Sequence, residues 1–501
     1  MTPSFLFVRP PRPLWPFNGP STAFWPPLAF ASLAAALREG VRDVGVEILD
    51  APALRMGWRT LTREIHARRP AWVGIGEEAV SCVEGLRLAR VAKDAGAAVV
   101  AGGCFFGHVA GEALRTGCID VVVHGEGEQT IVELVQALQS GDRRDLARVA
   151  GISFADGEEI VTTPPRALLP DLDRLPLPAY DLLPVGRYGR GSRNHPNLAA
   201  IELGRGCVGA CGFCVLWRQM GRAVGEGVMP QLRTKSPDRL LDEIRVLTRR
   251  FDRRYLAWVD PCFNADARVP GELAERLLRE GTSIGQGAWL RGDCTVRDAR
   301  SGALARLVAA GLNEVYLGVE RPDADGLRAL NKTATIDETR EAFATLRRDY
   351  PHVFTVGSFI YGLQGDTPAT VRAMYRFAGE LGMDKTFFIP LAPLPGTAAW
   401  RPEFWDPTGE RFREFDFLPS VGRHGQPADL GLALLSACAF DWTRERVRSN
   451  LARLLHRDAR KRRMARHIFL RSTAFAASTL VRGLLGRDKV GGMVLPRWYE
   501  S

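Results

Sequence analysis

The chain has 501 residues, of which 46% are hydrophobic and 25% charged, a composition typical of a globular protein. Its length exceeds what one hydrophobic core usually organises, so two or three domains are expected. No run of residues is apolar enough over a sufficient length to span a bilayer, and the N-terminus lacks the basic start and cleavage site of a secretory signal. These observations predict a cytoplasmic protein.

The net charge of +10 is concentrated at one end of the chain. Residues 441–501 contain 15 Lys and Arg but only 5 Asp and Glu, so this tail holds the whole excess. Nucleic-acid recognition depends on a concentrated basic face, and the rest of the chain is neutral, so nucleic-acid binding is not expected. The tail itself predicts either a solvated helical face that closes the fold or a peripheral contact with a membrane surface.

Strands and helices alternate over residues 1–150, which predicts a parallel, doubly wound sheet. Strands are expected at 4–10, 44–51, 71–76, 97–103 and 119–128, with helices at 29–38, 86–95 and 132–138. Ligands on such sheets bind beyond the carboxyl ends of the strands. Glycines gather at these ends, among them Gly102, Gly103, Gly125 and Gly127.

The rest of the chain divides into three parts. Residues 151–195 are proline-rich and lack periodicity, which predicts a linker. Residues 196–400 contain a second series of strands, expected at 197–203, 254–260, 283–290, 314–320, 355–363 and 385–392. Six βα units predict a partial (β/α)6 barrel of the TIM type, with functional residues at the C-terminal strand ends. Residues 401–501 predict a loop-rich start and then a basic helical region.

Three of the nine cysteines lie in the segment GRGCVGACGFC, directly after the first strand of the expected barrel. Its glycines allow a tight loop that brings three thiolates, those of Cys207, Cys211 and Cys214, around one group. Thiolates suit zinc or an iron–sulfur cluster, but a structural zinc site normally closes with four ligands. Because the other cysteines are isolated in sequence, the pattern favours a cluster with one open corner.

At these residues the chain resembles the radical S-adenosylmethionine (SAM) superfamily. The superfamily's signature is C-x3-C-x2-C with an aromatic residue before the third cysteine, here Phe213. The resemblance implies a [4Fe–4S] cluster on Cys207, Cys211 and Cys214 whose open iron chelates SAM. Reductive cleavage of SAM would then give a 5′-deoxyadenosyl radical that abstracts hydrogen from the substrate. It also implies a reducing partner such as flavodoxin or ferredoxin.

Later segments resemble further motifs of the superfamily in the same order. VDPCFN (259–264) stands in the place of a DD-x-F motif with its second Asp replaced by Pro261, and WLRGD, LGVE, GLQGD and PLPGT follow. The resemblance implies SAM contacts from Phe213, Asp260, Arg291, Glu320 and Gly362. No general acid or base can be chosen among the strand-end carboxylates Asp260, Asp293 and Asp366. Cys262 and Cys294 are expected to be either pocket thiols or inert core residues.

The N-terminal region resembles the cobalamin-binding domain that precedes the radical SAM domain in one large subgroup. The matching residues are AGG (101–103) and IDVVVHGEGE (119–128), which imply cobalamin contacts from Gly102, Gly103, Gly125, Glu126 and Gly127. Cys104 and Phe105 replace the usual Pro-His, and no D-x-H-x-x-G motif occurs. A histidine ligand to cobalt is therefore not predicted, although His108 and His124 lie near the expected strand ends.

Three functions remain open on this basis. The first is a cobalamin-dependent radical SAM methyltransferase that acts on an unactivated carbon of a small molecule. The second is an anaerobic oxidative cyclase on a tetrapyrrole-like substrate, because FWPPLAF, CVLWR and LNKTAT resemble the anaerobic magnesium-protoporphyrin IX monomethyl ester cyclases. The third is a cobalamin or iron–sulfur sensor without turnover, whose basic tail would contact a partner.

Overall fold

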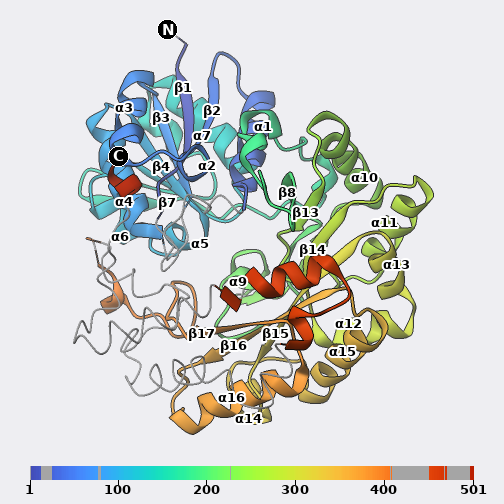
Figure 1. Ribbon diagram of the computed structural model, residues 1–501. Coiled ribbons are helices and arrows are strands. Elements are labelled where there is room, and N and C mark those ends of the chain that lie inside the picture. Colours follow the sequence, from blue (N-terminus) through green and yellow to red (C-terminus); the bar gives the residue numbers. More distant parts are fainter. Residues whose placement is uncertain are drawn as a thin grey trace.

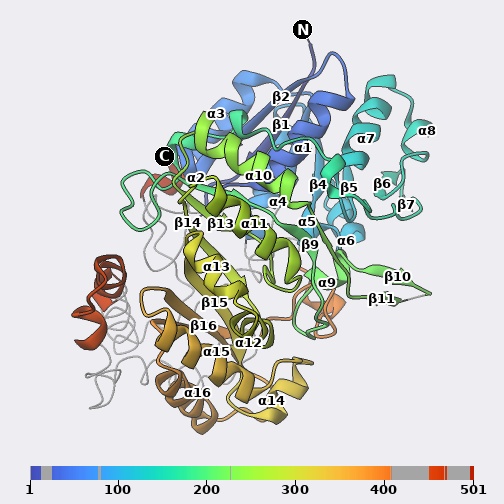
Figure 2. The same ribbon diagram turned by 90° about the vertical axis from the view of Figure 1, so that its right-hand side faces the viewer.

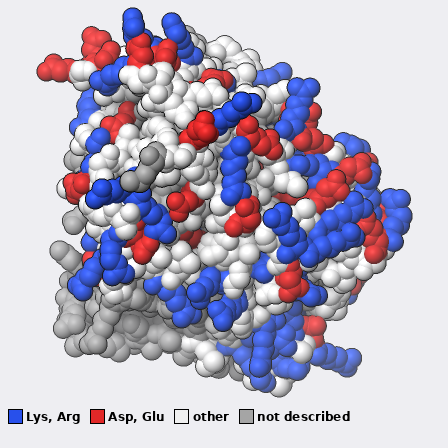
Figure 3. Space-filling view, turned by 90° about the horizontal axis from the view of Figure 1, so that it is seen from above, with Lys and Arg blue, Asp and Glu red and all other residues white. Residues whose placement is uncertain are grey.

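Two β-sheets, one in each half of the chain, organise the protein (Figure 1). The computed structural model describes residues 2–12, 25–76, 81–225, 227–406, 408, 451–467, 469–470 and 497–501. No helix among these residues is long and apolar enough to cross a membrane. On the face in Figure 3, most basic side chains lie beside acidic ones, as the even charge balance outside the tail leads one to expect.

The first sheet has the strand order β2-β1-β3-β4-β5-β6-β7. Its parallel strands are β1 (Ser4–Arg9), β2 (Gly45–Asp50), β3 (Trp72–Gly76), β4 (Ala98–Gly102) and β5 (Val121–Val123). Helices α1 (Leu28–Gly40) and α7 (Glu128–Ser140) cover one face, and α3 (Trp58–Arg68), α4 (Cys82–Asp94) and α6 (Ala110–Arg115) cover the other. Short helices α2 (Ala51–Leu54), α5 (Gly103–Phe106) and α8 (Arg143–Leu146) complete this part.

Both faces of this sheet are buried, as a doubly wound sheet requires. Along β1, Phe5 and Phe7 belong to the core under α1 and α7, whereas Leu6 and Val8 belong to the core under α3 and α4. Successive side chains of a strand point to opposite faces, so a continuous apolar run fits between two layers of helices. The predicted doubly wound domain is confirmed.

One hairpin in the first sheet was not expected. Strands β6 (Ile152–Asp156) and β7 (Glu159–Thr162) pair antiparallel with each other, and β6 pairs antiparallel with β5. The proline-rich sequence of residues 151–195 predicts a linker here instead. These strands are short and only Ile152 and Phe154 of β6 are apolar and buried, so the alternation is too brief to stand out.

The linker proper is packed rather than extended. It contains three 3-10 turns, Leu172–Arg174, Tyr180–Leu182 and Val185–Arg187. Tyr180, Leu183 and Tyr188 are buried in the same apolar cluster as β1 and the barrel strands, and the Tyr188 hydroxyl donates to Asp50 at 2.7 Å. One continuous core therefore crosses the boundary between the two sheets.

The second sheet is a partial barrel with the strand order β17-β16-β15-β14-β13-β8, all strands parallel and in chain order. The strands are β8 (Leu198–Ile201), β13 (Tyr255–Trp258), β14 (Gly285–Leu290), β15 (Leu312–Glu320), β16 (Phe354–Tyr361) and β17 (Lys385–Pro390). Helices cover its outer face in Figure 2: α10 (Pro237–Arg245), α11 (Arg268–Arg279), α12 (Gly292–Arg300), α13 (Ala303–Ala309), α14 (Ala324–Ala329), α15 (Ile336–Asp349) and α16 (Pro368–Leu381). The predicted (β/α)6 architecture is confirmed.

Two small antiparallel ribbons lie between β8 and β13 and were not expected. Strand β9 (Gly204–Gly206) pairs with β12 (Leu232–Thr234), and β10 (Arg222–Val224) pairs with β11 (Gly227–Met229). Helix α9 (Leu216–Gln219) lies between the ribbons in sequence, and β10–β11 projects from the body of the protein in Figure 2. Each strand has three residues, too few for a sequence periodicity to reveal.

The described part of the C-terminal region contacts both domains. Arg460 pairs with Glu314 at 2.9 Å and Lys461 pairs with Asp384 at 2.9 Å, at the N-terminal ends of β15 and β17. Helix α20 (Arg497–Glu500) instead lies against α3 and α4 of the first domain, where the Tyr499 hydroxyl donates to Glu84 at 3.0 Å. Residues 409–450 and 471–496 of the predicted basic region lie outside the described residues.

We predict that Tyr499→Ala destabilises the first domain. The Tyr499 ring is buried and meets the Trp58 ring edge to face, with centroids 6.3 Å apart. Truncating a buried aromatic side chain costs about 3 kcal/mol, so the urea midpoint of the first domain should fall. Leu455→Ala is the control, because that side chain is 74% exposed. An unchanged midpoint in Tyr499→Ala would contradict the packing of α20.

Candidate functional site

The cysteine loop, residues 207–214, begins at the ribbon of β9 and β12. The Cys207 amide donates to the Gln231 carbonyl oxygen at 3.1 Å, which extends the ribbon by one bond. Gly206 has φ +93°, and a β-carbon there would lie 1.9 Å from the same oxygen. Only glycine can adopt this backbone conformation at such a close approach, so Gly206 fixes where the loop leaves the ribbon.

The thiols of the loop converge near Gly209. A β-carbon on Gly209 would lie 3.8 Å from the Cys211 sulfur and 3.9 Å from the Cys207 sulfur, and its amide donates to the Cys207 sulfur at 3.4 Å. Burial raises the pKa of Cys211, and the nearby Cys214 and Cys207 raise it further. Burial likewise raises the pKa of Cys214. The three predicted ligands thus lie in one loop with their thiols near one another.

The segment between α14 and α15 holds the other side of this loop. The Gly212 amide donates to the Leu330 carbonyl at 2.9 Å, and the Asn331 side chain donates to the Ala210 carbonyl at 2.7 Å. The next residue, Lys332, is half-buried and donates to Glu320 at 3.1 Å. Burial opposes the charge on Lys332, but the attraction of Glu320 and Cys211 raises its pKa. A cation therefore stands beside the thiols.

Glu320 lies at the C-terminal end of β15 in an unusual backbone conformation. Its φ is +61°, and the register with β16 shifts between Gly318 and Glu320. A β-carbon on Gly318 would lie 2.2 Å from the Glu320 carboxylate and 2.8 Å from the Lys332 amine. Glycine at 318 is thus what allows the Glu320–Lys332 pair to sit against the strand.

Arg291 provides a second cation at the loop. Its guanidinium donates to both oxygens of Asp293, at 3.0 and 2.8 Å, and to the Thr333 hydroxyl at 2.8 Å. Its third nitrogen lies 3.1 Å from the position of a β-carbon on Gly209. Because positive charge stabilises thiolates, Lys332 and Arg291 fit a loop that binds a thiolate-ligated group.

The other predicted SAM contacts have partners within the protein. Asp260 is fully buried and accepts from the amides of Leu203 and Gly204 at 2.9 and 2.7 Å, so it supports the turn before the cysteine loop. The Gly362 amide donates to Asp366 at 2.7 Å. Phe213 is half-buried between the second and third cysteines. The roles of these residues toward SAM remain predictions.

The glycines predicted to contact cobalamin lie at the carboxyl edge of the first sheet. Gly102 ends β4, and Gly103 and Gly125 have φ +84° and +66°. This edge lies close to the barrel mouth at Gly396. A β-carbon on Gly396 would lie 2.3 Å from the ring of His108, which belongs to the first domain, and 2.8 Å from Val215, the residue after Cys214. The predicted cobalamin edge and the cysteine loop are therefore neighbours.

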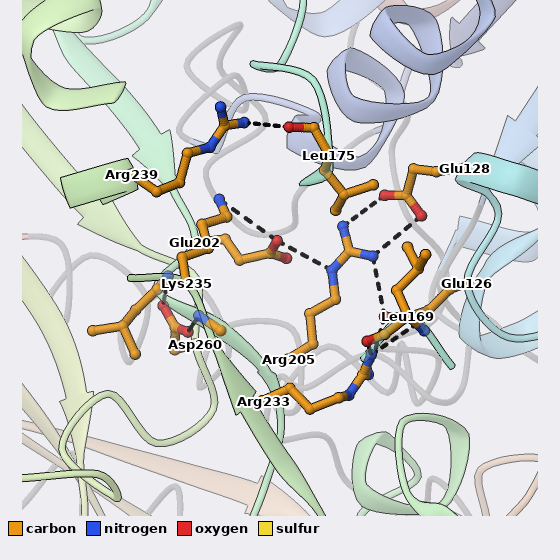
Figure 4. A network of polar contacts seen from close by, with 12 residues as sticks. Glu126, Glu128, Leu169, Leu175, Glu202, Arg205, Arg233, Lys235, Arg239 and Asp260 are labelled. Atoms are coloured by element: carbon orange, nitrogen blue, oxygen red, sulfur yellow. Dashed lines mark hydrogen bonds and ion pairs between the residues drawn. The ribbon is translucent and has the colours of Figure 1, made fainter. Parts of the chain in front are cut away.

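Glu126 faces the barrel rather than the carboxyl edge on which we expected it. Its two carboxylate oxygens accept from Arg233 at 3.0 Å each, from Arg205 at 3.1 Å and from the Leu169 amide at 2.8 Å (Figure 4). Burial opposes the charge on Glu126, yet Arg233 and Arg205 lower its pKa. These two arginines could not be predicted as partners of Glu126, because they lie far away in sequence, in the other domain.

Two nearby histidines also have protein partners. His124 lies 3.0 Å from the Gly107 carbonyl through Nδ1 and 2.8 Å from the Ser153 hydroxyl through Nε2. His108 Nδ1 lies 3.0 Å from the Cys104 carbonyl. Burial lowers the pKa of both imidazoles, which favours their neutral forms.

Comparison with known proteins agrees with this architecture. The model of the radical SAM superfamily matches residues 201–378, and that of the B12 binding domain matches residues 17–135. The chain is 29% identical over 378 residues to an uncharacterized methyltransferase of Pyrococcus horikoshii, covering 75% of this chain and 78% of the relative. It is 27% identical over 399 residues to the anaerobic magnesium-protoporphyrin IX monomethyl ester cyclase of Rubrivivax gelatinosus, covering 78% and 68%.

A solved structure shares the fold. The radical SAM methyltransferase TsrM of Kitasatospora setae, solved with its tryptophan substrate and a SAM analogue, gives a TM-score of 0.62 at 21% identity, covering 79% of this chain and 74% of that one. A doubly wound sheet, a partial barrel and a three-cysteine loop at the barrel mouth define the class of radical SAM proteins with a B12-binding domain. The chain contains a radical SAM domain, matched over residues 201–378, and carries a B12-binding domain, matched over residues 17–135, ahead of it.

Two cations near the loop, Lys332 and Arg205, were not predicted as site residues. Lys332 stands in LNKTAT and Arg205 in GRGC, but Lys332 pairs with Glu320, and Arg205 pairs with Glu126 and Glu128 of the other domain as well as with the nearby Glu202. The charged residue between glycines in GRGC and the acidic residues of GEGE are features that could have indicated an ion pair. Neither feature identifies the other as its partner.

We predict a pH dependence of stability that originates at Asp260. Burial raises the pKa of this carboxyl from 3.8 to about 7, so between these pH values the folded state holds a proton that the unfolded state releases. The free energy of unfolding should therefore fall as the pH rises through this window, by up to about 4 kcal/mol. Denaturant unfolding of wild type and Asp260→Asn across pH 4 to about 8 measures the effect. Equal pH slopes in the two proteins would contradict it.

Proposed function

We propose that this protein is a cobalamin-dependent radical SAM methyltransferase that acts on an unactivated carbon of a small molecule. The observation that carries the proposal is that the cysteine loop and the carboxyl edge of the first sheet lie next to each other. The three-cysteine loop at the barrel mouth lies against the glycine-lined carboxyl edge of the B12-binding domain, with His108 and Val215 both next to Gly396. A substrate held between these edges would face both cofactors.

The residues at the barrel mouth fit a [4Fe–4S] cluster. Cys207, Cys211 and Cys214 supply three thiols from one loop, and Lys332 and Arg291 place positive charge beside them. When bound, the cluster would supply the electron that cleaves SAM, and cobalamin would carry the methyl group. In this proposal the electron comes from a reductant such as flavodoxin or ferredoxin.

The protein's own side chains would hold SAM in place. The Glu320 carboxylate lies at the end of β15 beside Cys211 and Lys332, so it is placed to accept from an ammonium group at the open corner of the cluster. Arg291 lies beside Gly209 and would bind a carboxylate, although Asp293 occupies two of its nitrogens. Both roles are part of the proposal.

The names of the relatives favour an enzyme and leave two reactions open. The relatives named above are a methyltransferase and a cyclase, both enzymes by name, so a sensor without turnover is not supported. The oxidative cyclase stays the second candidate, because a cyclase is 27% identical over most of this chain. Methylation would add a methylene mass to the substrate, whereas cyclisation would change its oxygen or hydrogen content.

The first test is metal content and SAM cleavage. After anaerobic reconstitution with iron, sulfide and hydroxocobalamin, wild type should hold about four irons and one cobalt per chain, and Cys211→Ala should lose the iron but keep the cobalt. With SAM and dithionite, wild type should form both 5′-deoxyadenosine and S-adenosylhomocysteine. The matched control is Cys118→Ala, which removes a buried thiol of the first domain.

Either cofactor result can refute part of the proposal. Iron without cobalt would remove methyl transfer through cobalamin, and 5′-deoxyadenosine without S-adenosylhomocysteine would favour the cyclase. No iron in wild type would reject the radical SAM chemistry itself.

We predict that Gly318→Ala weakens SAM binding. The added methyl group would meet the Glu320 carboxylate at 2.2 Å and the Lys332 amine at 2.8 Å, so this pair must shift from its present position. We expect SAM affinity, measured by calorimetry on the reconstituted protein, to fall by about tenfold or more. Gly186→Ala is the control, because a β-carbon there meets no atom within 4 Å. Equal affinities in both variants would count against a role for Glu320.

A further inference from the structure

A buried ion-pair network joins the B12-binding domain to the base of the cysteine loop (Figure 4). Arg205 of β9 donates to Glu128 at 2.6 and 3.1 Å, to Glu126 at 3.1 Å and to Glu202 at 3.1 Å. Arg233 of β12 donates to both oxygens of Glu126 at 3.0 Å. Each of the four side chains Glu126, Glu128, Arg205 and Arg233 is more than nine-tenths buried.

The ribbon alone places like charges together. Arg205 and Arg233 are directly opposite each other in the β9–β12 pairing. Like charges directly opposite across two strands destabilise the pairing, and burial away from water adds to this cost. The carboxylates that offset these two charges come largely from the other domain, because Glu126 lies in the turn between β5 and α7 and Glu128 is the first residue of α7. The ribbon therefore needs the B12-binding domain for its own stability.

This ribbon carries the cysteine loop. Gly206 ends β9, and Cys207 follows it with its amide bonded to Gln231, the residue before β12. Arg205 lies two residues before Cys207. A change in the pairing of Arg205 with Arg233 would therefore move the first cysteine directly, since no flexible segment separates them.

The linker is tied into the same network. The Leu169 amide donates to Glu126 at 2.8 Å, and the Leu169 carbonyl accepts from Arg233 at 2.5 Å. Further along the barrel side, Lys235 pairs with Glu243 at 3.1 Å, and the Tyr180 hydroxyl of the linker donates to the same Glu243 at 2.5 Å. Three separate segments thus meet at one set of charges.

We infer that Glu126 and Glu128 are positioning residues for the cysteine loop, acting through Arg205 from across the domain boundary. The same turn contains Gly125 and Gly127 at the carboxyl edge of the first sheet. Glu126 and Glu128 alternate with these glycines, and their carboxylates bind Arg205 and Arg233. A shift of this turn would therefore move both the predicted cobalamin edge and the base of the cysteine loop. This inference rests on the proposed function, because it assumes that the loop holds a cluster.

The experiment compares Glu126→Gln, Glu128→Gln and wild type as reconstituted full-length proteins. Each variant removes one negative charge from the first domain and leaves every cysteine in place. We expect a ferrous chelator to strip iron about fivefold faster or more from both variants, the lower end of the range for coupling between two sites. We also expect the electron paramagnetic resonance spectrum of the dithionite-reduced cluster, and its change on adding SAM, to differ from wild type.

Controls separate positioning from general damage. Glu133→Gln removes a carboxylate from the same helix, α7, whose partner Arg166 is not part of the network, and it should match wild type. Cobalt uptake and circular dichroism report whether the first domain of each variant is folded. If Glu128→Gln yields no folded protein, Glu126→Gln decides by the same readouts, because Arg205 then keeps its two bonds to Glu128.

A double variant tests the route through Arg205. Arg205→Gln combined with Glu128→Gln should lose iron no faster than Arg205→Gln alone, because the carboxylate then has no guanidinium to act on. Additive losses would overturn the inference, as would Glu126→Gln and Glu128→Gln proteins with the iron retention and spectra of wild type. A wild-type protein without iron would instead reject the proposed function, and this inference with it.

Discussion

Charge buried between the two sheets determines how the mouth of the barrel is built. A guanidinium removed from water is stable only when carboxylates or carbonyls replace the lost solvent, and Arg205 finds three carboxylates while Arg233 finds one carboxylate and a carbonyl. Two of those three carboxylates belong to the first domain. The relative placement of the domains is therefore a condition for folding the ribbon of β9 and β12, and with it the start of the cysteine loop.

The cysteine loop itself has almost no regular structure, so its shape depends on contacts from outside. The ribbon holds its beginning, the Leu330–Lys332 segment holds its middle, and Trp217 of α9 donates to the Cys211 carbonyl at 2.9 Å. Lys332 and Arg291 place two positive charges around three thiols. These positive charges reduce the repulsion among the thiolates even without a metal. The loop therefore suits a group that three thiolates bind.

The sequence predicted both sheets because their signals are local. Continuous apolar runs such as SFLFVR and VVV identify buried parallel strands, and the C-x3-C-x2-C spacing places three thiols in one loop. The β6–β7 hairpin and the ribbons were missed because strands of three to five residues leave little periodicity. The Glu126–Arg233 and Glu320–Lys332 pairs were missed for another reason. Each joins residues whose proximity depends on the tertiary fold, and neither residue of a pair identifies its partner by type alone.

Helix α20 has a consequence for the stability of the first domain. The chain leaves the first domain through the linker near Thr163, and α20 brings residues 497–501 back to α3 and α4 of that domain, where Arg87 also pairs with Glu500 at 2.7 Å. The last residues of the chain therefore form part of the core of its first domain. Removing them would expose the buried Trp58 ring and leave the buried Glu84 carboxylate without the Tyr499 hydroxyl.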